Sequence, residues 1–219
     1  MIYNITTMDK IDKRKLMDIY REGNMENTDY FYPEIADKEQ AVAKVESDFL
    51  KYIETDFLSS SGNVYWVLEE NAVWVSALRL YRVDNALYYI EALETHPDFR
   101  RQGHASKLLD SVINELKKQG SFRLCDCVSK KNTASIRTHE KCGFRVVSEG
   151  GFDYLSNEAD DRHYGMEYLW VNGLFGDSDT NVKKVVNLDQ FVMPATERGQ
   201  DADKYIRELR VNERLQLTE

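Results

Sequence analysis

The stretch Leu93-Glu-Thr-His-Pro-Asp-Phe-Arg-Arg-Gln-Gly-His-Ala-Ser-Lys107 decides the expected fold. It joins a predicted β-strand over residues 86–95 to a loop over residues 96–102 and then to a helix over residues 104–119. Apolar side chains recur along this helix at the spacing i, i+3 and i+4, so one face of the helix is expected to pack against a sheet. Gly120 is expected to end the helix, because glycine readily adopts the left-handed conformation found at helix ends.

The loop before this helix has the composition of an anion site. A helix N-terminus presents unpaired N–H groups and the positive end of the helix dipole, and a diphosphate is a natural ligand there. Gly103 lets the backbone approach an anion closely, since it carries no side chain. Arg100 and Arg101 add positive charge, while Ala105 and Ser106 add little bulk. Taken alone, the same pattern also fits a plain strand-to-helix turn.

The segments on either side of this stretch show alternating strand and helix patterns. Upstream, the periodicity predicts a short strand over residues 1–7, helices over 9–22 and 37–58, and strands over 64–68, 72–81 and 86–95. Downstream, it predicts a strand over residues 122–128, a short helix over 132–142, and strands over 144–148 and 162–171. Tight turns between consecutive upstream strands predict an antiparallel meander.

Composition places the chain among globular proteins. Of its 219 residues, 42% are hydrophobic and 31% are charged, a balance that supports a folded core. The formal net charge of −9 argues against nucleic acid and anionic membranes as partners, because both favour basic surfaces. No stretch approaches the roughly 18 apolar residues that a membrane helix needs, and no basic segment followed by an apolar run opens the chain. We therefore expect a cytoplasmic protein.

The three cysteines give no signal of a disulfide framework or a metal site. Their number is odd, which leaves no complete set of pairs. Cys125 and Cys127 alternate onto one face of a predicted strand, and no second group of ligands follows at a spacing typical of zinc sites. We interpret them as small buried hydrophobic residues and expect no metal.

Two motifs resemble those of the GCN5-related N-acetyltransferases, the GNAT family. Arg100-Arg-Gln-Gly103-His-Ala105 matches the family signature Arg/Gln-x-x-Gly-x-Gly/Ala. Asn132-Thr-Ala-Ser-Ile-Arg-Thr-His-Glu-Lys-Cys-Gly143-Phe144 resembles its second motif, Asn-x-x-Ala/Ser followed by Lys-x-Gly-Phe. The order of predicted elements also agrees with the family over residues 1–172. The resemblance implies an α/β (α+β) fold whose mixed, mostly antiparallel central sheet contains a splayed parallel strand pair and is flanked by helices.

The resemblance also implies a division of the chain into two parts. We expect a GNAT-like domain over residues 1–174 and a C-terminal extension over residues 175–219, where the composition changes. Residues 201–217 have a helical pattern, so the extension is expected to be partly helical. Three arrangements are open, in which the extension packs on its own domain, reaches a neighbouring subunit and builds a homodimer, or is mobile.

Acetyl-CoA is the donor that the resemblance implies. In the family it lies in a V-shaped gap between two parallel strands, which correspond to residues 86–95 and 122–128. Backbone groups of the first strand pair with the pantetheine amides, as an added strand would, and the loop N–H groups hold the pyrophosphate. The implied contacts to the donor are Leu93, Thr95, Arg100, Arg101, Gly103, His104, Ala105, Ser106 and Asn132.

The implied reaction is direct attack of an amine on the thioester, which requires removal of a proton from the amine. Glu91 is the candidate base, because strand alternation predicts that it shares a face with Leu93 and Thr95. The alternative is that Glu91 only pairs with a cation such as Arg79. His139 stands where many family members have a tyrosine acid, and it is either a proton donor or a packing residue.

No motif identifies the acceptor. The main hypothesis is a primary amine of a small molecule. Residues 30–33 are expected in an aromatic loop. In this family, that region and the loop over residues 150–161 wall the acceptor site, which implies that the acidic residues Asp153, Glu158, Asp160 and Asp161 attract a cationic acceptor. The alternative is that the aromatic residues only clamp the core. Two alternatives are a CoA-binding sensor or regulatory module with little catalysis, and an acetyltransferase that acts on a protein or peptide amine.

Overall fold

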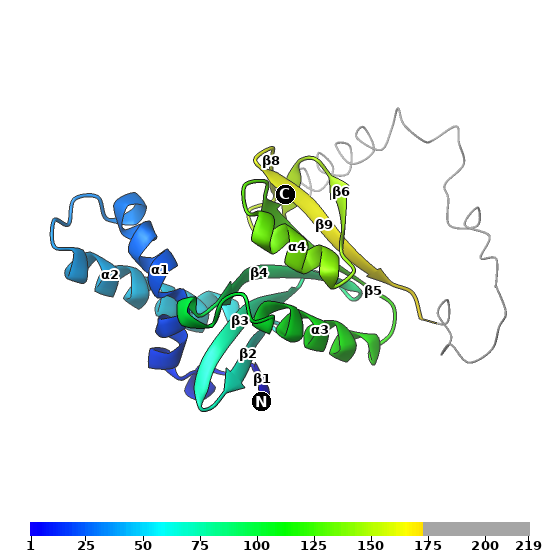
Figure 1. The fold of residues 1–219 in the computed structure, drawn as a ribbon, viewed down its shortest axis with the longest axis horizontal. Coiled ribbons are helices and arrows are strands. Elements are labelled where there is room, and N and C mark those ends of the chain that lie inside the picture. The colour runs from blue at the N-terminus through cyan, green and yellow to red at the C-terminus, as the bar shows by residue number, and fades with distance from the viewer. Residues whose placement is uncertain (173–219) are drawn as a thin grey trace, which may run out of the picture. The chain divides into compact units, whose positions relative to one another are not determined.

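The computed structural model describes residues 1–172, and the extension expected over residues 175–219 lies outside them. A seven-stranded mixed sheet forms the centre, with the strand order β1-β2-β3-β4-β5-β9-β6 (Figure 1). The β4–β5 pair is parallel and the other neighbouring pairs of this sheet are antiparallel, which confirms the predicted fold class. The strands are β1 (Ile2–Ile5), β2 (Val64–Glu70), β3 (Val73–Arg82), β4 (Leu87–Thr95), β5 (Phe122–Ser129), β6 (Arg145–Ser148) and β9 (His163–Trp170).

The parallel pair of strands opens into a gap. β4 and β5 are paired only between Leu87–Tyr89 and Arg123–Cys125. Beyond this point β4 continues to Thr95 and β5 continues to Ser129 without further pairing between them. The facing backbone edges of β4 and β5 are therefore not paired with each other in this region.

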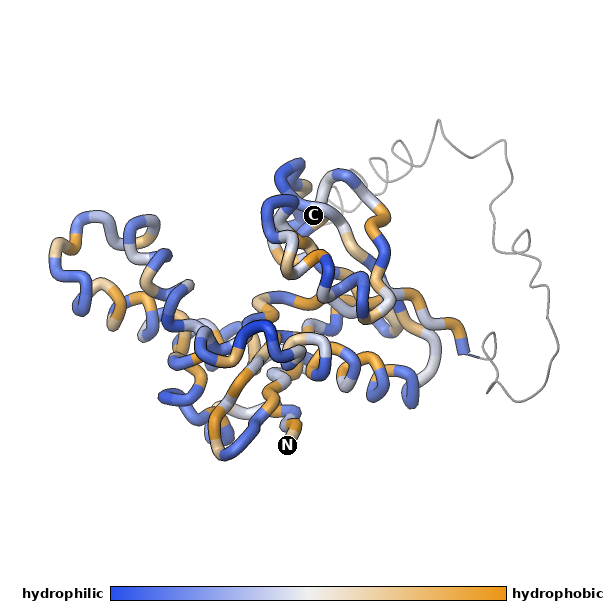
Figure 2. Tube along the Cα trace, in the orientation of Figure 1, coloured by the Kyte–Doolittle hydropathy of each residue, from blue (hydrophilic) through white to orange (hydrophobic). Residues whose placement is uncertain are grey.

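Within residues 1–172, two helices cover each face of the sheet, and a separate hydrophobic core lies between the sheet and each pair of helices. Leu108, Leu109 and Val112 of α3 pack with Phe144 on one face. Leu16 and Ile19 of α1 pack with the segment after α2 on the other. Hydrophobic and hydrophilic residues alternate along α3, as an amphipathic helix on a sheet requires (Figure 2). The helices are α1 (Lys13–Phe31), α2 (Lys38–Tyr52), α3 (His104–Lys117) and α4 (Thr133–Lys141), and short helical turns lie at Met8–Lys10, Ile53–Phe57 and Pro97–Phe99.

Helix α1 is longer and begins later than the helix predicted over residues 9–22. Its start is set by Asp12, whose side chain accepts a hydrogen bond from the Lys15 backbone N–H. Beyond Gly23 the helix continues through Tyr30 and Phe31, which were expected in a loop. Packing against α2 supports this extension, because Asn24 and Thr28 are buried within it.

The Gly- and Asp-rich loop expected before the last strand contains a small hairpin. Its strands are β7 (Gly151–Asp153) and β8 (Glu158–Asp160), which pair with each other in an antiparallel ladder. The hairpin lies against β5, and a Cβ atom at Gly151 would lie 2.8 Å from the Cys127 sulfur. The hairpin therefore requires glycine at this contact.

Candidate functional site

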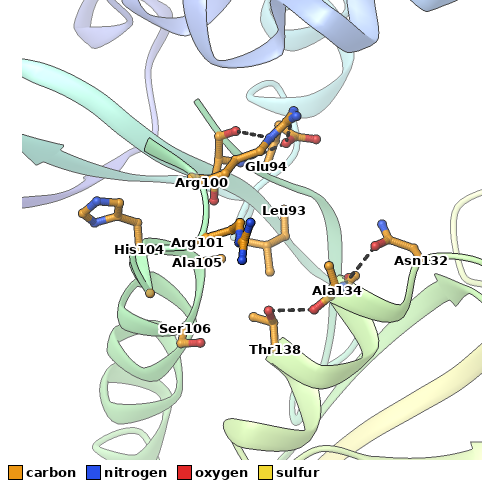
Figure 3. A pocket seen from close by; sticks show the side chains of 13 residues that line it. Leu93, Glu94, Arg100, Arg101, His104, Ala105, Ser106, Asn132, Ala134 and Thr138 are labelled. Atoms are coloured by element: carbon orange, nitrogen blue, oxygen red, sulfur yellow. Dashed lines mark hydrogen bonds and ion pairs between the residues drawn. The ribbon is translucent and has the colours of Figure 1, made fainter. Parts of the chain in front are cut away.

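A cleft of about 480 Å³ lies where β4 opens away from β5. Its wall is formed by the end of β4, the loop that follows, the first turn of α3 and the first turns of α4 (Figure 3). Every residue predicted to contact the donor lines this cleft, so the structure brings together two motifs that begin 32 positions apart in the sequence. The lining residues are Leu93, Glu94, Thr95, Arg100, Arg101, Gly103, His104, Ala105, Ser106, Asn132, Ala134, Ser135 and Thr138.

The loop before α3 turns sharply through two residues with left-handed backbone conformations. Arg101 has a φ of 64° and Gly103 a φ of 83°, and Gly103 is the residue that directly precedes α3. A Cβ atom at Gly103 would meet no other atom within 4 Å, so the space beside this residue is open. The helix N-terminus, with its unpaired N–H groups, therefore borders free space of the kind that an anion needs.

The two loop arginines have different environments. Arg100 pairs with Glu22 of α1 at 2.5 Å and with Glu94 at 3.3 Å, and its Nε also donates to the carbonyl oxygen of Thr95 at 3.3 Å. Within residues 1–172, the Arg101 guanidinium has no ion-pair partner, and Figure 3 shows it directed into the cleft. Arg101 is therefore the loop cation whose charge is available to a ligand, while Arg100 ties the loop to α1 and β4.

His104 lines the cleft without directing its side chain into it. The ring points away from the other labelled residues in Figure 3 and is 8% exposed. Its Nδ1 lies 3.7 Å from the Glu70 carboxylate, and the ring packs edge-on against Phe99. The contribution of His104 to the cleft therefore comes from its backbone at the start of α3.

A β-bulge changes the direction of side chains along β4. Ala77 pairs with Glu94 and Arg79 with Glu91, so both Ala92 and Leu93 lie opposite Leu78. Ala92 has a left-handed φ of 53° and packs in the core under α1, whereas Leu93 packs in the core under α3. The predicted alternation is therefore wrong at this point, because the extra residue reverses the direction of every later side chain.

As a result, Glu91 lies on the α1 face of the sheet and does not share a face with Leu93. Its Oε2 accepts hydrogen bonds from Nε of Arg79 at 3.0 Å and from the Tyr81 hydroxyl at 2.7 Å, and Nη2 of Arg79 lies 2.8 Å away. The Arg79 guanidinium packs over the rings of Phe49 and Tyr52 from α2. The side chain of Glu91 is nevertheless 36% exposed, so the ion pair considered from the sequence exists and leaves the carboxylate accessible.

His139 belongs to α4, is fully buried and does not line the cleft. Its Nε2 lies 2.7 Å from Oδ2 of Asp126 on β5, and its Nδ1 lies 2.9 Å from the carbonyl oxygen of Ser135. Burial by itself lowers the pKa of His139. The hydrogen bond and the charge of Asp126 raise this pKa by more than burial lowers it, so it lies above the ordinary value of 6.5. The placement is that of a buried ion pair, and the acid role of His139 stays a prediction.

This ion pair should make the stability of the protein depend on pH. A raised folded-state pKa means that the ion pair stabilises the fold fully below about pH 6.5 and loses this effect as the pH rises through the folded pKa. We expect His139→Gln to lower the free energy of unfolding by about 2 kcal/mol at pH 5.5, with a smaller loss at pH 9. Denaturant unfolding of both proteins across this range measures the difference. Asp126→Asn should flatten the same pH dependence, and a difference that grows with pH would contradict the assignment.

Several lining residues were missed by the sequence reasoning. Ala134, Ser135 and Thr138 come from the first turns of α4, and Glu94 comes from β4. Ala134 and Thr138 are four residues apart and therefore share a helix face, which is a signal that the sequence carries. The direction of that face toward the cleft depends on tertiary packing.

The acidic residues expected around the acceptor are partly engaged by neighbours. Asp153 accepts hydrogen bonds from the backbone N–H of Leu155 and the hydroxyl of Ser156. Asp160 binds the guanidinium of Arg162, which holds the pKa of Asp160 well below its usual range. These contacts stabilise the turns of the β7–β8 hairpin and reduce the charge that is left to attract a cation.

The three cysteine thiols are wholly or partly buried. Burial raises the pKa values of Cys125, Cys127 and Cys142, to about 11 for Cys127 and about 12 for Cys142. These thiols therefore stay protonated near neutral pH.

No group of three or more metal-binding side chains occurs within residues 1–172. In the same range, no helix combines the length and the apolar character needed to span a bilayer.

Comparison with known proteins gives one family match. The family model described as "Acetyltransferase (GNAT) family" matches residues 23–144, which is more than half of the chain. No curated protein sequence matches significantly.

Solved structures share the fold at low sequence identity. The PaiA N-acetyltransferase of Thermoplasma acidophilum, in complex with coenzyme A, has a TM-score of 0.52 at 16% identity, covering 78% of this chain and 99% of that one. A GNAT-family acetyltransferase of Staphylococcus aureus Mu50 has a TM-score of 0.51 at 20% identity, covering 77% and 99%. The ribosomal-protein-S18-alanine N-acetyltransferase of Escherichia coli has a TM-score of 0.50 at 16% identity, covering 82% and 99%. At these identities the likeness shows the fold alone.

Proposed function

Since the chain belongs to the GNAT acetyltransferase family, we propose that it transfers the acetyl group of acetyl-CoA to a primary amine of a small molecule. The observation that carries this proposal is the cleft at the β4–β5 opening, which is lined by both family motifs. The amine attacks the thioester carbonyl carbon directly, forming the amide bond as the bond between carbon and sulfur breaks and CoA leaves as a thiolate.

The residues of the loop suit the pyrophosphate of the donor. The N-terminal turn of α3 offers backbone N–H groups beside the open space at Gly103. Arg101 supplies a cation without a competing carboxylate among the described residues. We assign Ala105, Ser106 and the backbone of His104 to the same anion site, because all three line the cleft at the start of α3.

The opening between the strands suits the pantetheine arm. Beyond Tyr89 the facing backbone edge of β4 has no pairing with β5, so an extended chain with amide groups can bind there like an added strand. The backbone of Thr95 already has partners, because its N–H donates to Glu94 Oε1 at 3.1 Å and its carbonyl accepts from Arg100. We therefore assign the main amide contacts to the backbone around Leu93, with Asn132 at the far wall.

Glu91 is the proposed base. Its three interactions with Arg79 and Tyr81 all involve Oε2, which leaves Oε1 free to take the proton from the incoming amine. Because Glu91 and Leu93 lie on opposite faces of β4, the donor and the acceptor would approach the reacting carbonyl from opposite sides of the strand. We assign no residue as a general acid for the leaving thiolate, since an ordinary thiol pKa near 8.5 already makes the thiolate a good leaving group.

The acceptor is assigned as a small amine because the surroundings of Glu91 are aromatic. Phe49, Tyr52 and Tyr81 lie around the Arg79–Glu91 pair on the α1 and α2 side. Aromatic faces and a carboxylate together recognise a compact cation. The second candidate function is a CoA-binding module with little catalysis, and it is favoured by the burial of His139 at the position of the usual tyrosine acid.

A calorimetric titration with acetyl-CoA, followed by a thiol-release assay against a panel of small amines, tests the proposal. We expect micromolar binding, about −8 kcal/mol, and turnover with at least one amine. A second panel contains peptide amines. Acetyl-CoA binding with turnover on peptide amines but not on small amines would show that the acceptor is a peptide or protein amine. Binding without turnover on either panel would favour the sensor function. The absence of binding would contradict both functions.

A further inference from the structure

The bulge in β4 is held in a conformation that an alanine does not adopt freely. Ala92 has a φ of 53°, in the left-handed region that is unfavourable for residues with a Cβ atom. Such a residue persists only where its surroundings fix the backbone, and these residues concentrate at functional sites. The bulge lies where the strands separate and directly before Leu93, the first residue that lines the cleft.

A buried tyrosine holds this bulge from the α1 side. The hydroxyl of Tyr20 on α1 donates a hydrogen bond to the carbonyl oxygen of Ala92 at 2.8 Å. The hydroxyl of Tyr65 on β2 donates in turn to the Tyr20 hydroxyl at 2.9 Å. Tyr20 is 8% exposed and Tyr65 is fully buried. Burial raises both pKa values, that of Tyr65 to about 12, so both hydroxyls keep their protons at neutral pH.

Because the peptide unit is planar, the hydrogen bond to the Ala92 carbonyl also fixes the direction of the next N–H group. The carbonyl of Ala92 and the N–H of Leu93 belong to one planar trans peptide unit and point in opposite directions. Tyr20 binds the carbonyl from the α1 side. The N–H of Leu93 therefore points away from α1. The Leu93 side chain lies on the same side, where it packs toward α3 and lines the cleft.

We propose that Tyr20 is a positioning residue that directs the Leu93 N–H toward the carbonyl oxygen of the bound thioester. This inference rests on the proposed function, because it needs acetyl-CoA in the cleft. An N–H fixed in this direction stabilises the negative charge that develops on the carbonyl oxygen during attack. Tyr20 itself touches neither the donor nor the acceptor and acts only through the peptide unit that it holds.

The test uses the full chain and acetyl-CoA labelled with carbon-13 at the thioester carbonyl. A hydrogen bond to the carbonyl oxygen lowers its infrared stretching frequency, so the bound donor reports on the Leu93 N–H directly and needs no acceptor. We expect the frequency to be higher when the donor is bound to Tyr20→Phe than when it is bound to the wild type. Ala92→Gly, combined with Tyr20→Phe, should recover the lower frequency, because glycine adopts the left-handed conformation without a Cβ clash.

Tyr65→Phe is the matched control. It removes a buried hydroxyl of the same kind but leaves the hydrogen bond from Tyr20 to Ala92 in place. We expect this variant to lose stability while keeping the wild-type carbonyl frequency. A merely structural role of Tyr20 predicts that Tyr20→Phe and Tyr65→Phe behave alike.

The outcomes separate this inference from the proposed function. If the wild type does not bind acetyl-CoA in the calorimeter, the proposed function fails and the inference fails with it. If binding is intact but Tyr20→Phe leaves the frequency unchanged, or the double variant does not recover it, only the positioning role is overturned. If Tyr20→Phe does not fold, the double variant carries the test: a wild-type carbonyl frequency supports the role, and a higher frequency or a failure to fold overturns it.

Discussion

Gly103→Glu is expected to weaken acetyl-CoA binding at least about a hundredfold, which corresponds to roughly 2.7 kcal/mol. The substitution places a carboxylate in the open space at the N-terminus of α3, where the proposed pyrophosphate would lie. Like charges brought together in an interface cost several kcal/mol. The side chain is also strained at a φ of 83°. Calorimetric titration of the folded variant measures the loss.

Two further variants separate charge from backbone strain. Gly120→Glu introduces the same side chain at another left-handed glycine with open space around it, after the end of α3 and outside the cleft. It should lower stability while leaving acetyl-CoA affinity intact. Gly103→Ala adds the strain without the charge and should weaken binding much less than Gly103→Glu. Unchanged affinity in a folded Gly103→Glu variant would remove the loop from the donor site.

Glu91→Gln is expected to lower kcat by about a hundredfold or more, the usual effect of losing a general base. Glutamine keeps the size of the side chain and can still accept hydrogen bonds from Arg79 and Tyr81, so the fold around it should be preserved. The KM for acetyl-CoA should change little, because Glu91 does not line the cleft proposed for the donor. Steady-state kinetics with an amine identified in the panel provides both values.

Glu94→Gln is the matched comparison on the same strand. Glu94 lines the cleft that we propose for the donor and pairs with Arg100, so its loss should act mainly on the KM for acetyl-CoA. If kcat is unchanged in Glu91→Gln, Glu91 is not the base and serves only as an ion-pair partner of the buried Arg79. Equal effects of both substitutions on kcat would also argue against a specific proton transfer at Glu91.

The residues that line the cleft at the β4–β5 opening could largely be predicted from the sequence, because the signals that identify them are local. The glycine at position 103, the arginines before it and the amphipathic pattern after it lie within a single strand–loop–helix unit. Asn132 and the helix that it caps are equally local, and its side chain accepts a hydrogen bond from the Ser135 N–H as expected for such a residue. Their convergence on one cleft follows from the order of the strands.

The parts that could not be predicted depend on contacts between distant segments. The bulge at Ala92 has no sequence signature, since alanine is not a residue that favours a left-handed conformation, and a hydroxyl from α1 binds its carbonyl. The pairing of Arg100 with Glu22 joins residues 78 positions apart. His139 and Asp126 lie on different elements, so neither position alone indicated a buried ion pair.

The bulge in β4 has a consequence for how substrate preference can change. It places Glu91 and its aromatic neighbours on one side of the strand and the Leu93-lined cleft on the other. Under the proposed function, substitutions on α1 and α2 can alter which amine is accepted while the donor site keeps its residues. Donor use and acceptor choice can therefore evolve, or be engineered, as separate properties of the same domain.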